Sequence, residues 1–315
     1  MNTRKVLILT DGKAGHENQS RAFARALGEA SDCVEIHFKS KAHKALSYLL
    51  DWLGVSTLSL FTGVDVRLPR GGYSAVVGTG SGTFYAVKAL ARRLGVKGGV
   101  VLYPRGYRIA TFDCILAPSF DRPAKAPNVI EIPANLVAND AAFYAKGVAD
   151  FRARTAVVPD VAVIVGGPNK CATLTADGMR RWLDAIFAQP GAKAVTTSRR
   201  TPPDVEAVVD SYPWDYKLIY SQDRFNPIPA FVSLAKRLYV TAESTGMLSE
   251  ACTFGTAEVV ALDDLRPGPH KFRRFVDGLV AGGYAAWGAP SASSAAARKV
   301  DLPGPFAAAR CRMGG

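Results

Sequence analysis

Residues 6–12 read VLILTDG, an apolar run that ends in a polar residue and a glycine. Residues 161–167 read VAVIVGG and repeat this pattern in the second half of the chain. Apolar runs without polar alternation are typical of strands that are buried on both faces of a parallel sheet. Glycine directly after such a strand allows a tight turn into a helix, which is how a βαβ unit begins. The two stretches therefore predict two α/β domains in tandem.

Short apolar runs alternate with helical stretches along both halves of the sequence. The predicted strands of the first half are 6–10, 34–38, 75–80, 99–104, 113–118 and 128–133. Those of the second half are 161–167, 194–198, 217–221, 237–241 and 258–262. Predicted helices lie at about 18–27, 83–94, 139–154, 175–188, 203–211 and 245–254. This order of elements is typical of doubly wound, Rossmann-like domains.

The expected domains are residues 1–155 and residues 156–290, which agrees with a length of 315 residues. The tail at 291–315 is rich in Ala, Ser and Pro, and we expect it to pack weakly or to cross back to the first domain as a short helix at 305–312. The segment ALSYLLDWLGVSTLSLF at 45–61 is predicted as a core helix, with a helix that touches a membrane as the alternative.

The chain carries 39 Lys and Arg against 27 Asp and Glu, a formal net charge of +12. Such a surface attracts phosphates, acidic lipid headgroups or nucleic acid. The basic residues are scattered and lack an interleaved aromatic platform, which disfavours a nucleic-acid partner.

The 5 cysteines form no CxxC or Cys/His cluster, so neither a disulfide framework nor a zinc site is predicted. No export signal or membrane-spanning stretch is evident, so we expect a cytoplasmic protein that is soluble or peripheral on the inner membrane.

Ligands of open parallel sheets bind beyond the carboxyl ends of the strands, so the residues directly after the predicted strands are the candidates for chemistry. In DGKAGHENQ at 11–19, glycines allow a tight turn that places His16 in a loop ahead of the helix. A neutral imidazole can accept a hydroxyl proton, so His16 is the candidate general base, with Asp11 to orient it or share the task. The alternative is that His16 only helps to cap the helix.

Four further glycine- or serine-containing turns follow predicted strands. GTGSGT at 78–83 offers backbone N–H groups to an anion or to sugar hydroxyls, although close packing of a helix on a strand would also demand its glycines. GGPNK at 166–170 and SRR at 198–200 bring cations to one rim, where they can hold a pyrophosphate or be solvated charges. The residues expected at this rim are Gly166, Gly167, Lys170, Arg199 and Arg200.

The last turn lies in VTAESTGMLSEACTFG at 240–255. Ser244 is placed to cap a helix whose first N–H groups, at Thr245 and Gly246, can hold a phosphate. Glu250 on the following turns can accept hydrogen bonds from both hydroxyls of a ribose. Capping alone would explain Ser244, but it would not explain a carboxylate inside an otherwise apolar helix.

Five motifs in order carry a resemblance that spans about residues 6–287. They are DGKAGHENQS, VIVGGPNK followed by TTSRRTP, NPIPAFVSLA, VTAESTGMLSEA and KFRRF at 271–275. With them the chain looks like a bacterial member of the mitochondrial fission "elongated mitochondria" family, which is similar to glycosyltransferase-B proteins.

The resemblance implies two Rossmann-like domains facing across a cleft, with a nucleotide sugar on the C-terminal half and an acceptor on the N-terminal half. By position it implies Gly166, Gly167, Ser198 and Arg199 at the diphosphate and Glu243, Ser244, Met247 and Glu250 along the nucleotide pocket. Asn226 and Pro227 would bound the base or the sugar. The chain departs from the family where Asp-Ser-x-Ser-Met is expected, because residues 243–247 read ESTGM, and where Gly-Lys-Pro-Val is expected, because residues 255–258 read GTAE.

No Asp-x-Asp motif follows a strand and Asp263-Asp264 is a lone acidic pair, so neither a divalent metal nor a cofactor other than the sugar donor is expected. The leading hypothesis is a glycosyltransferase in which His16 deprotonates an acceptor hydroxyl and the basic surface recruits a lipid-linked or anionic membrane acceptor. One alternative is a nucleotide-sugar epimerase, with Asp11, Glu17 and Asp121 as its candidate acid/base groups. Another is a non-catalytic protein that binds a nucleotide or remodels membranes.

Overall fold

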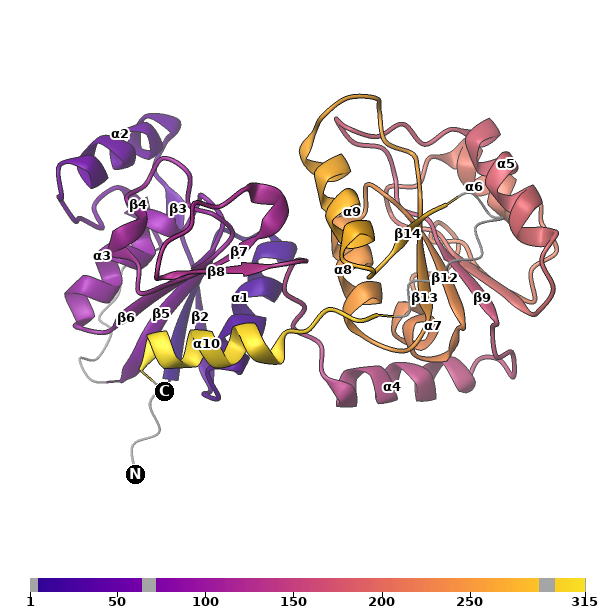
Figure 1. Cartoon of the computed structure of the whole chain (residues 1–315), viewed down its shortest axis with the longest axis horizontal. Helices are drawn as coiled ribbons and strands as arrows, with labels where there is room; N and C mark the ends of the chain where they lie inside the picture. The colour runs from indigo at the N-terminus through magenta and orange to yellow at the C-terminus, as the bar shows by residue number, and fades with distance from the viewer. Residues whose placement is uncertain (1–4, 64–71, 289–297, 315) are drawn as a thin grey trace. The chain divides into compact units, whose positions relative to one another are not determined.

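The computed structural model describes residues 5–63, 72–288 and 298–314, and the chain divides into two compact units (Figure 1). Unit 1 comprises Met1–Ala138 and Asp301–Gly315, and unit 2 comprises Asn139–Val300. The division falls before helix α4 (Ala141–Arg152), whereas the sequence analysis had placed it at residue 155. The helix belongs to unit 2 because its Phe151, which is fully buried, packs against Phe231 with the ring centroids 5.8 Å apart.

Unit 1 is built on a parallel sheet whose strand order is β2-β1-β5-β6-β7-β8. Its strands are β1 (Lys5–Thr10), β2 (Ser31–Glu35), β5 (Tyr73–Thr79), β6 (Lys97–Val101), β7 (Cys114–Pro118) and β8 (Val129–Ile132). Its helices are α1 (Ala14–Ala26), α2 (Lys41–Trp52), α3 (Phe84–Leu94), α10 (Pro303–Met313) and the short 3-10 helices η1 (Ile109–Thr111) and η2 (Ser119–Asp121). The single strand predicted at 34–38 is divided, because β3 (His37–Phe38) pairs antiparallel with β4 (Phe61–Thr62).

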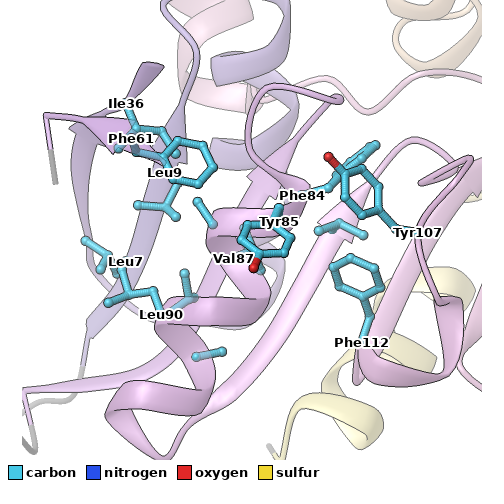
Figure 2. Packing of buried hydrophobic residues seen from close by; sticks show 14 of the residues in the cluster. Leu7, Leu9, Ile36, Phe61, Phe84, Tyr85, Val87, Leu90, Tyr107 and Phe112 are labelled. Atoms are coloured by element: carbon cyan, nitrogen blue, oxygen red, sulfur yellow. The ribbon is translucent and has the colours of Figure 1, made fainter. Parts of the chain in front are cut away.

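The core of unit 1 lies between this sheet and helix α3. Leu7 and Leu9 of β1 belong to one apolar cluster with Phe84, Tyr85 and other residues of α3, and Figure 2 shows residues of this cluster. Each fully buried leucine or phenylalanine contributes about 1.5–3 kcal/mol to folding. Helix α10 contacts α1, β7 and β8, and the C-terminal tail thus belongs to unit 1.

Helix α2 lies at the edge of this core, so the prediction of a core helix holds only in part: its Tyr48 and Leu50 are half-buried and pack against the core. Its Leu46, Leu49 and Trp52 are exposed to 41%, 52% and 72%. The following residues of the same segment do join the core, since Leu60 and Phe61 are buried. The exposed residues face outward because the polar residues Ser47 and Asp51 of the same helix are buried on its inner side.

Unit 2 has a second parallel sheet, with the order β11-β10-β9-β12-β13-β14. Its strands are β9 (Val161–Ile164), β10 (Lys193–Thr196), β11 (Tyr216–Leu218), β12 (Arg237–Thr241), β13 (Glu258–Leu262) and β14 (Ala286–Trp287). Besides α4, its helices are α5 (Ala176–Phe187), α6 (Pro203–Asp210), α7 (Ile228–Leu234), α8 (Thr245–Thr253) and α9 (Lys271–Ala281). Its core packs α5 and α6 residues against the strands. Each unit is therefore Rossmann-like, as the sequence predicts.

Each sheet contains a point at which the chain reverses its direction of strand addition. In unit 1 this point lies between β1 and β5, and in unit 2 it lies between β9 and β12. Connections leave the two strands of such a pair on opposite sides, so the loops diverge and leave room beyond the carboxyl ends. These two positions are where a site is expected.

None of the helices in the described parts of the chain is long and apolar enough to cross a bilayer.

Candidate functional site

The first cluster of polar side chains lies at the reversal point of unit 1. Asp11 follows β1, and His16 lies in the first turn of α1, not in a loop ahead of the helix as predicted. The helix begins early because the carbonyl oxygen of Lys13 accepts the N–H groups of His16 and Glu17, at 2.9 and 3.0 Å. The first helical turn therefore holds the imidazole next to the strand end.

Asp11 and His16 form a dyad. Nδ1 of His16 lies 3.0 and 3.1 Å from the carboxylate oxygens of Asp11, and Lys13 Nζ lies 2.6 Å from Oδ2 of Asp11. Burial raises the pKa of Asp11, but the hydrogen bonds and charges of Lys13 and His16 outweigh it and lower that pKa overall. An ionised Asp11 accepts the proton of Nδ1, which leaves Nε2 of His16 as the basic nitrogen.

Two glycines of the loop at 78–83, Gly80 and Gly82, are required by this dyad. Gly80 has a φ of +83°, and a Cβ on it would lie 2.4 Å from Cε1 of His16. A Cβ on Gly82 would lie 2.8 Å from Cβ of Asp11. Of the two explanations offered for these glycines, close packing is the one that the structure supports, and contact with a ligand stays a prediction.

The second cluster lies at the reversal point of unit 2, where Glu243 follows β12. The Glu243 side chain is completely buried, and its Oε1 accepts hydrogen bonds from the N–H of Gly167, the hydroxyl of Ser244 and a guanidinium N–H of Arg200. The carboxylate thus joins the loop after β9, the loop after β10 and the start of α8. Glu243 thus links these loops by hydrogen bonds, and its carboxylate is not exposed to solvent.

Glycine is required at residues 166 and 167 for the same reason. A Cβ on Gly166 would lie 1.9 Å from Oε1 of Glu243, and a Cβ on Gly167 would lie 2.1 Å from the carbonyl oxygen of Arg200. The sequence analysis had explained these glycines by the close approach of a ligand. In the structure, close contacts with Glu243 and Arg200 already require glycine at both positions. Contact with a diphosphate stays a prediction.

Two threonines that the sequence analysis did not single out complete this framework. Thr241 accepts the N–H of Gly166 at 2.8 Å, and Thr201 donates its hydroxyl to the carbonyl oxygen of Gly166 at 2.6 Å. The N–H of Ser198 also donates to Thr201, at 2.8 Å. The signal was a hydroxyl residue at or shortly after the end of two predicted strands, but a hydroxyl there has many uses and its partner is distant in sequence.

A buried acidic pair lies beneath the loops. The N–H of Glu243 donates to Oδ1 of Asp264 at 3.2 Å, and Oε2 of Glu243 and Oδ2 of Asp264 find no hydrogen-bond partner within the described residues. Burial, together with the nearby charge of Glu243, raises the pKa of Asp264 to about 8. We conclude that Asp264 carries a proton at neutral pH, because two buried carboxylates in contact do not both ionise.

The neighbouring Asp263 points to a different partner. Its two oxygens accept both terminal nitrogens of Arg273, at 2.8 and 2.9 Å, so the adjacent acidic residues do not converge on one point. Within the described residues no group of three His, Cys, Asp or Glu side chains is placed to hold a metal ion.

The N-terminus of α8 is the feature of this cluster that faces outward. Ser244 occupies the cap position as predicted, but its hydroxyl binds Glu243 and does not cap the helix. The N–H of Thr245 reaches the carbonyl of Glu243 at 3.1 Å. The N–H groups of Gly246 and Met247 have no acceptor among the described residues, and Gly246 is exposed with open space around it. Two free donors at a helix N-terminus form a site for an anion.

Basic side chains lie on the loops after β9 and β10, which Glu243 links to the N-terminus of α8. Lys170 and Arg199 are exposed and pair with no carboxylate in the described residues. Arg200 is half exposed and is already committed, since it contacts Glu243 and the carbonyl of Gly167, each at 3.3 Å. Of the three predicted cations, Lys170 and Arg199 are therefore the ones available to a ligand.

Glu250 lies further along α8 and is largely buried. Its Oε1 accepts the hydroxyl of Tyr144 at 2.9 Å and the amide of Asn139 at 3.2 Å. Burial raises its pKa, against the effect of these two hydrogen bonds. A contact between Glu250 and a ribose stays a prediction, and it would have to use the other carboxylate oxygen or displace these donors.

The other predicted residues hold separate positions. Asn226 is exposed, and its side-chain oxygen accepts the N–H of Ile228 at 3.2 Å, near the start of α7. Met247 is half-buried in the first turn of α8. Glu17 pairs with Arg21 at 2.7 Å, and Asp121 lies in η2, so neither belongs to the dyad.

Two Rossmann-like units of this kind define the glycosyltransferase-B type of fold, and solved structures agree. UGT89C1 of Arabidopsis thaliana, in complex with UDP-L-rhamnose, matches with a TM-score of 0.53 at 10% identity, over 90% of this chain and 84% of that one. The glycosyltransferase SnogD of Streptomyces nogalater matches with a TM-score of 0.51 at 12% identity, over 99% of this chain and 95% of that one.

The sequence profile of the family described as Mitochondrial fission ELM1 matches residues 14–308, and the chain belongs to this family, as its motifs predict. No curated protein matches the chain significantly.

Proposed function

We propose that the protein transfers a sugar from a nucleotide sugar to an acceptor hydroxyl, and that unit 2 binds the donor through its diphosphate. The observation that carries the proposal is the start of α8, where Gly246 and Met247 present free N–H groups. Lys170 and Arg199 supply uncommitted positive charge on the adjoining loops. Preorganised amide donors and fixed cations can stabilise a leaving diphosphate, so the residues present suffice for this task.

The dyad of unit 1 supplies the base. Nε2 of His16 takes the proton of the acceptor hydroxyl as its oxygen forms a bond to the anomeric carbon of the sugar. The bond between that carbon and the diphosphate oxygen breaks, and the nucleoside diphosphate leaves with the electron pair. Asp11 stays ionised throughout and stabilises the imidazolium that forms.

The acceptor proposed for this reaction is anionic or lipid-linked, and the protein is proposed to work at the cytoplasmic face of the inner membrane. The support is the formal net charge of +12, which draws a protein toward acidic headgroups. The likeness in fold to the complex of UGT89C1 with UDP-L-rhamnose supports a nucleotide sugar as the donor class.

Binding and chemistry are tested separately. A thermal-shift screen against nucleoside diphosphates should show stabilisation, because a ligand at a hundredfold excess over Kd adds about 2.7 kcal/mol. His16→Ala should abolish transfer and leave this stabilisation intact. Loss of both, or of neither, contradicts the role of the dyad.

A non-catalytic role is the second candidate, because the family is described by mitochondrial fission and not by a reaction. It predicts nucleotide or membrane binding without turnover of any nucleotide sugar. Incubation with a nucleotide sugar alone also tests for an epimerase, which would yield an isomer without an acceptor.

A further inference from the structure

Helix α2 of unit 1 carries an apolar face that no described residue covers. This α2 apolar face consists of Leu46, Leu49 and Trp52, continued after the helix by Leu53 and Val55. All five side chains are at least 41% exposed, and Trp52 is exposed to 72%. Figure 1 shows α2 at the edge of unit 1. Leu46, Leu49 and Trp52 are spaced along one side of the helix and form a continuous stripe.

The side of α2 that faces inward is mixed: Tyr48 and Leu50 pack against the core, and the buried polar residues Ser47 and Asp51 lie on the same side. Ser47 is fully buried and lies 2.8 Å from the hydroxyl of Tyr107. Asp51 is also buried, accepts the N–H of Arg108 at 2.7 Å and forms an ion pair with Lys88. Rotation of the helix would strand these groups without partners, at a cost far above that of an exposed leucine. The structure therefore holds the apolar stripe outward.

Positive charge surrounds this stripe. Lys39 and Lys41 are exposed at the start of the helix, and Asp51, which is buried and paired, is the sole acidic residue of the sequence between 36 and 63. Beyond the helix end, Arg92 and Arg93 line a cavity of about 690 Å³ together with the loop at 54–58. Both arginines are exposed, and no ion pair with a carboxylate is found for either among the described residues.

We propose that the α2 apolar face docks the protein on a bilayer that contains anionic phospholipids, with Trp52 and Leu53 at the headgroup boundary and Arg92 and Arg93 binding headgroup phosphates in the adjoining cavity. Helices that lie in a membrane interface combine an apolar stripe with flanking cations. Tryptophan favours this depth because its ring is both apolar and a hydrogen-bond donor. A protein partner would have to match these cations with acidic groups, whereas a bilayer supplies phosphates everywhere along the stripe.

Docking through α2 rests on the proposed function, in which the protein works on an acceptor at a membrane. Its test uses no sugar donor, so docking and transfer can fail separately. A chain that binds vesicles but transfers no sugar would contradict the proposed reaction alone. A chain that transfers sugar to a soluble acceptor but ignores vesicles would contradict the docking alone.

The experiment is co-sedimentation of the full chain with vesicles of phosphatidylcholine, with and without phosphatidylglycerol. We expect binding to the anionic vesicles that weakens with salt, and loss of at least about tenfold in affinity for the double variant Trp52→Ser, Leu53→Ser. Arg92→Gln with Arg93→Gln should reduce the preference for anionic vesicles. Phe143→Ser is the matched control, because Phe143 is an exposed apolar residue of unit 2 and its loss should change nothing.

Depth is measured by quenching of tryptophan fluorescence with brominated lipids. Trp52 is the sole tryptophan of unit 1, so Trp52→Phe should remove the quenching while sedimentation with vesicles persists. Equal vesicle binding by the wild-type chain and the Trp52→Ser, Leu53→Ser variant would overturn the proposal. It would also be overturned if no vesicle bound, or if light scattering showed a dimer that this variant dissolves, because a second copy would then cover the face.

Discussion

Replacement of Gly80 by alanine tests whether the loop at 78–83 exists to seat the dyad. Gly80 has a φ of +83°, so any other residue costs about 1–2 kcal/mol in the backbone. Its Cβ would also lie 2.4 Å from Cε1 and 2.7 Å from Nδ1 of His16. The ring must move, and the contact between His16 and Asp11 is lost. For a partly exposed pair this adds about 1 kcal/mol.

Gly95→Ala is the matched control. Gly95 also has a positive φ, +70°, but a Cβ there meets nothing within 4 Å. The control should therefore lose only the backbone contribution of about 1–2 kcal/mol, whereas Gly80→Ala should lose about 2–3 kcal/mol.

Native-state hydrogen exchange of the β1 amide groups reports the opening of unit 1 without interference from unit 2. Sugar transfer should fall in Gly80→Ala and persist in Gly95→Ala. Equal loss of stability in the two variants would refute the conclusion that the loop is shaped around His16.

Three further predictions concern unit 2. Because the folded-state pKa of Asp264 is raised to about 8, the folded unit holds a proton that the unfolded chain releases, so stability should fall as pH rises from about 4 to about 8. Asp264→Asn should remove this slope in urea titrations, and a slope that persists would exclude Asp264 as its source. Glu250→Ala should cost about 1–3 kcal/mol in urea unfolding by leaving Tyr144 without its acceptor, while Glu250→Gln should cost little; equal costs would contradict this. Arg199→Gln should weaken nucleoside diphosphate binding in calorimetry without loss of stability, and unchanged affinity would remove Arg199 from the site.

Local sequence patterns predicted the elements of the fold well, because buried parallel strands are continuous apolar runs. The run at 237–241 predicts β12 at its observed bounds. The order of strands in each sheet could not be read in this way, because it depends on which strands pair across long stretches of chain. The pattern predicted two Rossmann-like domains, and the resemblance to a known family added the glycosyltransferase-B type of fold.

The orientation of α2 shows why periodicity has limits. An apolar stripe predicts a buried face. It does not show whether the rest of the protein offers hydrogen-bond partners to the polar residues on another face of the same helix. The partners of Ser47 and Asp51 include Tyr107, Arg108 and Lys88, which are 37 residues or more away in sequence. Only the folded chain brings them together.

The sequence predicted candidate residues directly after strands, and Asp11 and Glu243 do follow β1 and β12. Their role in a ligand site stays a prediction. The sequence placed Glu243 along a nucleotide pocket, but the carboxylate is buried and holds Gly167 and Arg200. The role of Glu243 depends on three loops that come into contact only in the folded chain, so no local sequence pattern predicts it. The nucleotide contact that we propose for this region therefore rests on the start of α8.

The central claim is that the N-terminus of α8 binds a diphosphate, and Gly246→Asp tests it most directly. There is space for the side chain, and a carboxylate in a first helical turn should stabilise the helix by about 0.3–1 kcal/mol while it repels the ligand. Gly15→Asp introduces the same charge in the first turn of α1, in unit 1, where space is also open. The measurement is calorimetric titration of the chain with UDP, ADP and GDP. We expect one of them to bind the wild-type chain and Gly15→Asp but not Gly246→Asp; binding unchanged in Gly246→Asp, or no binding by the wild-type chain, would contradict the account.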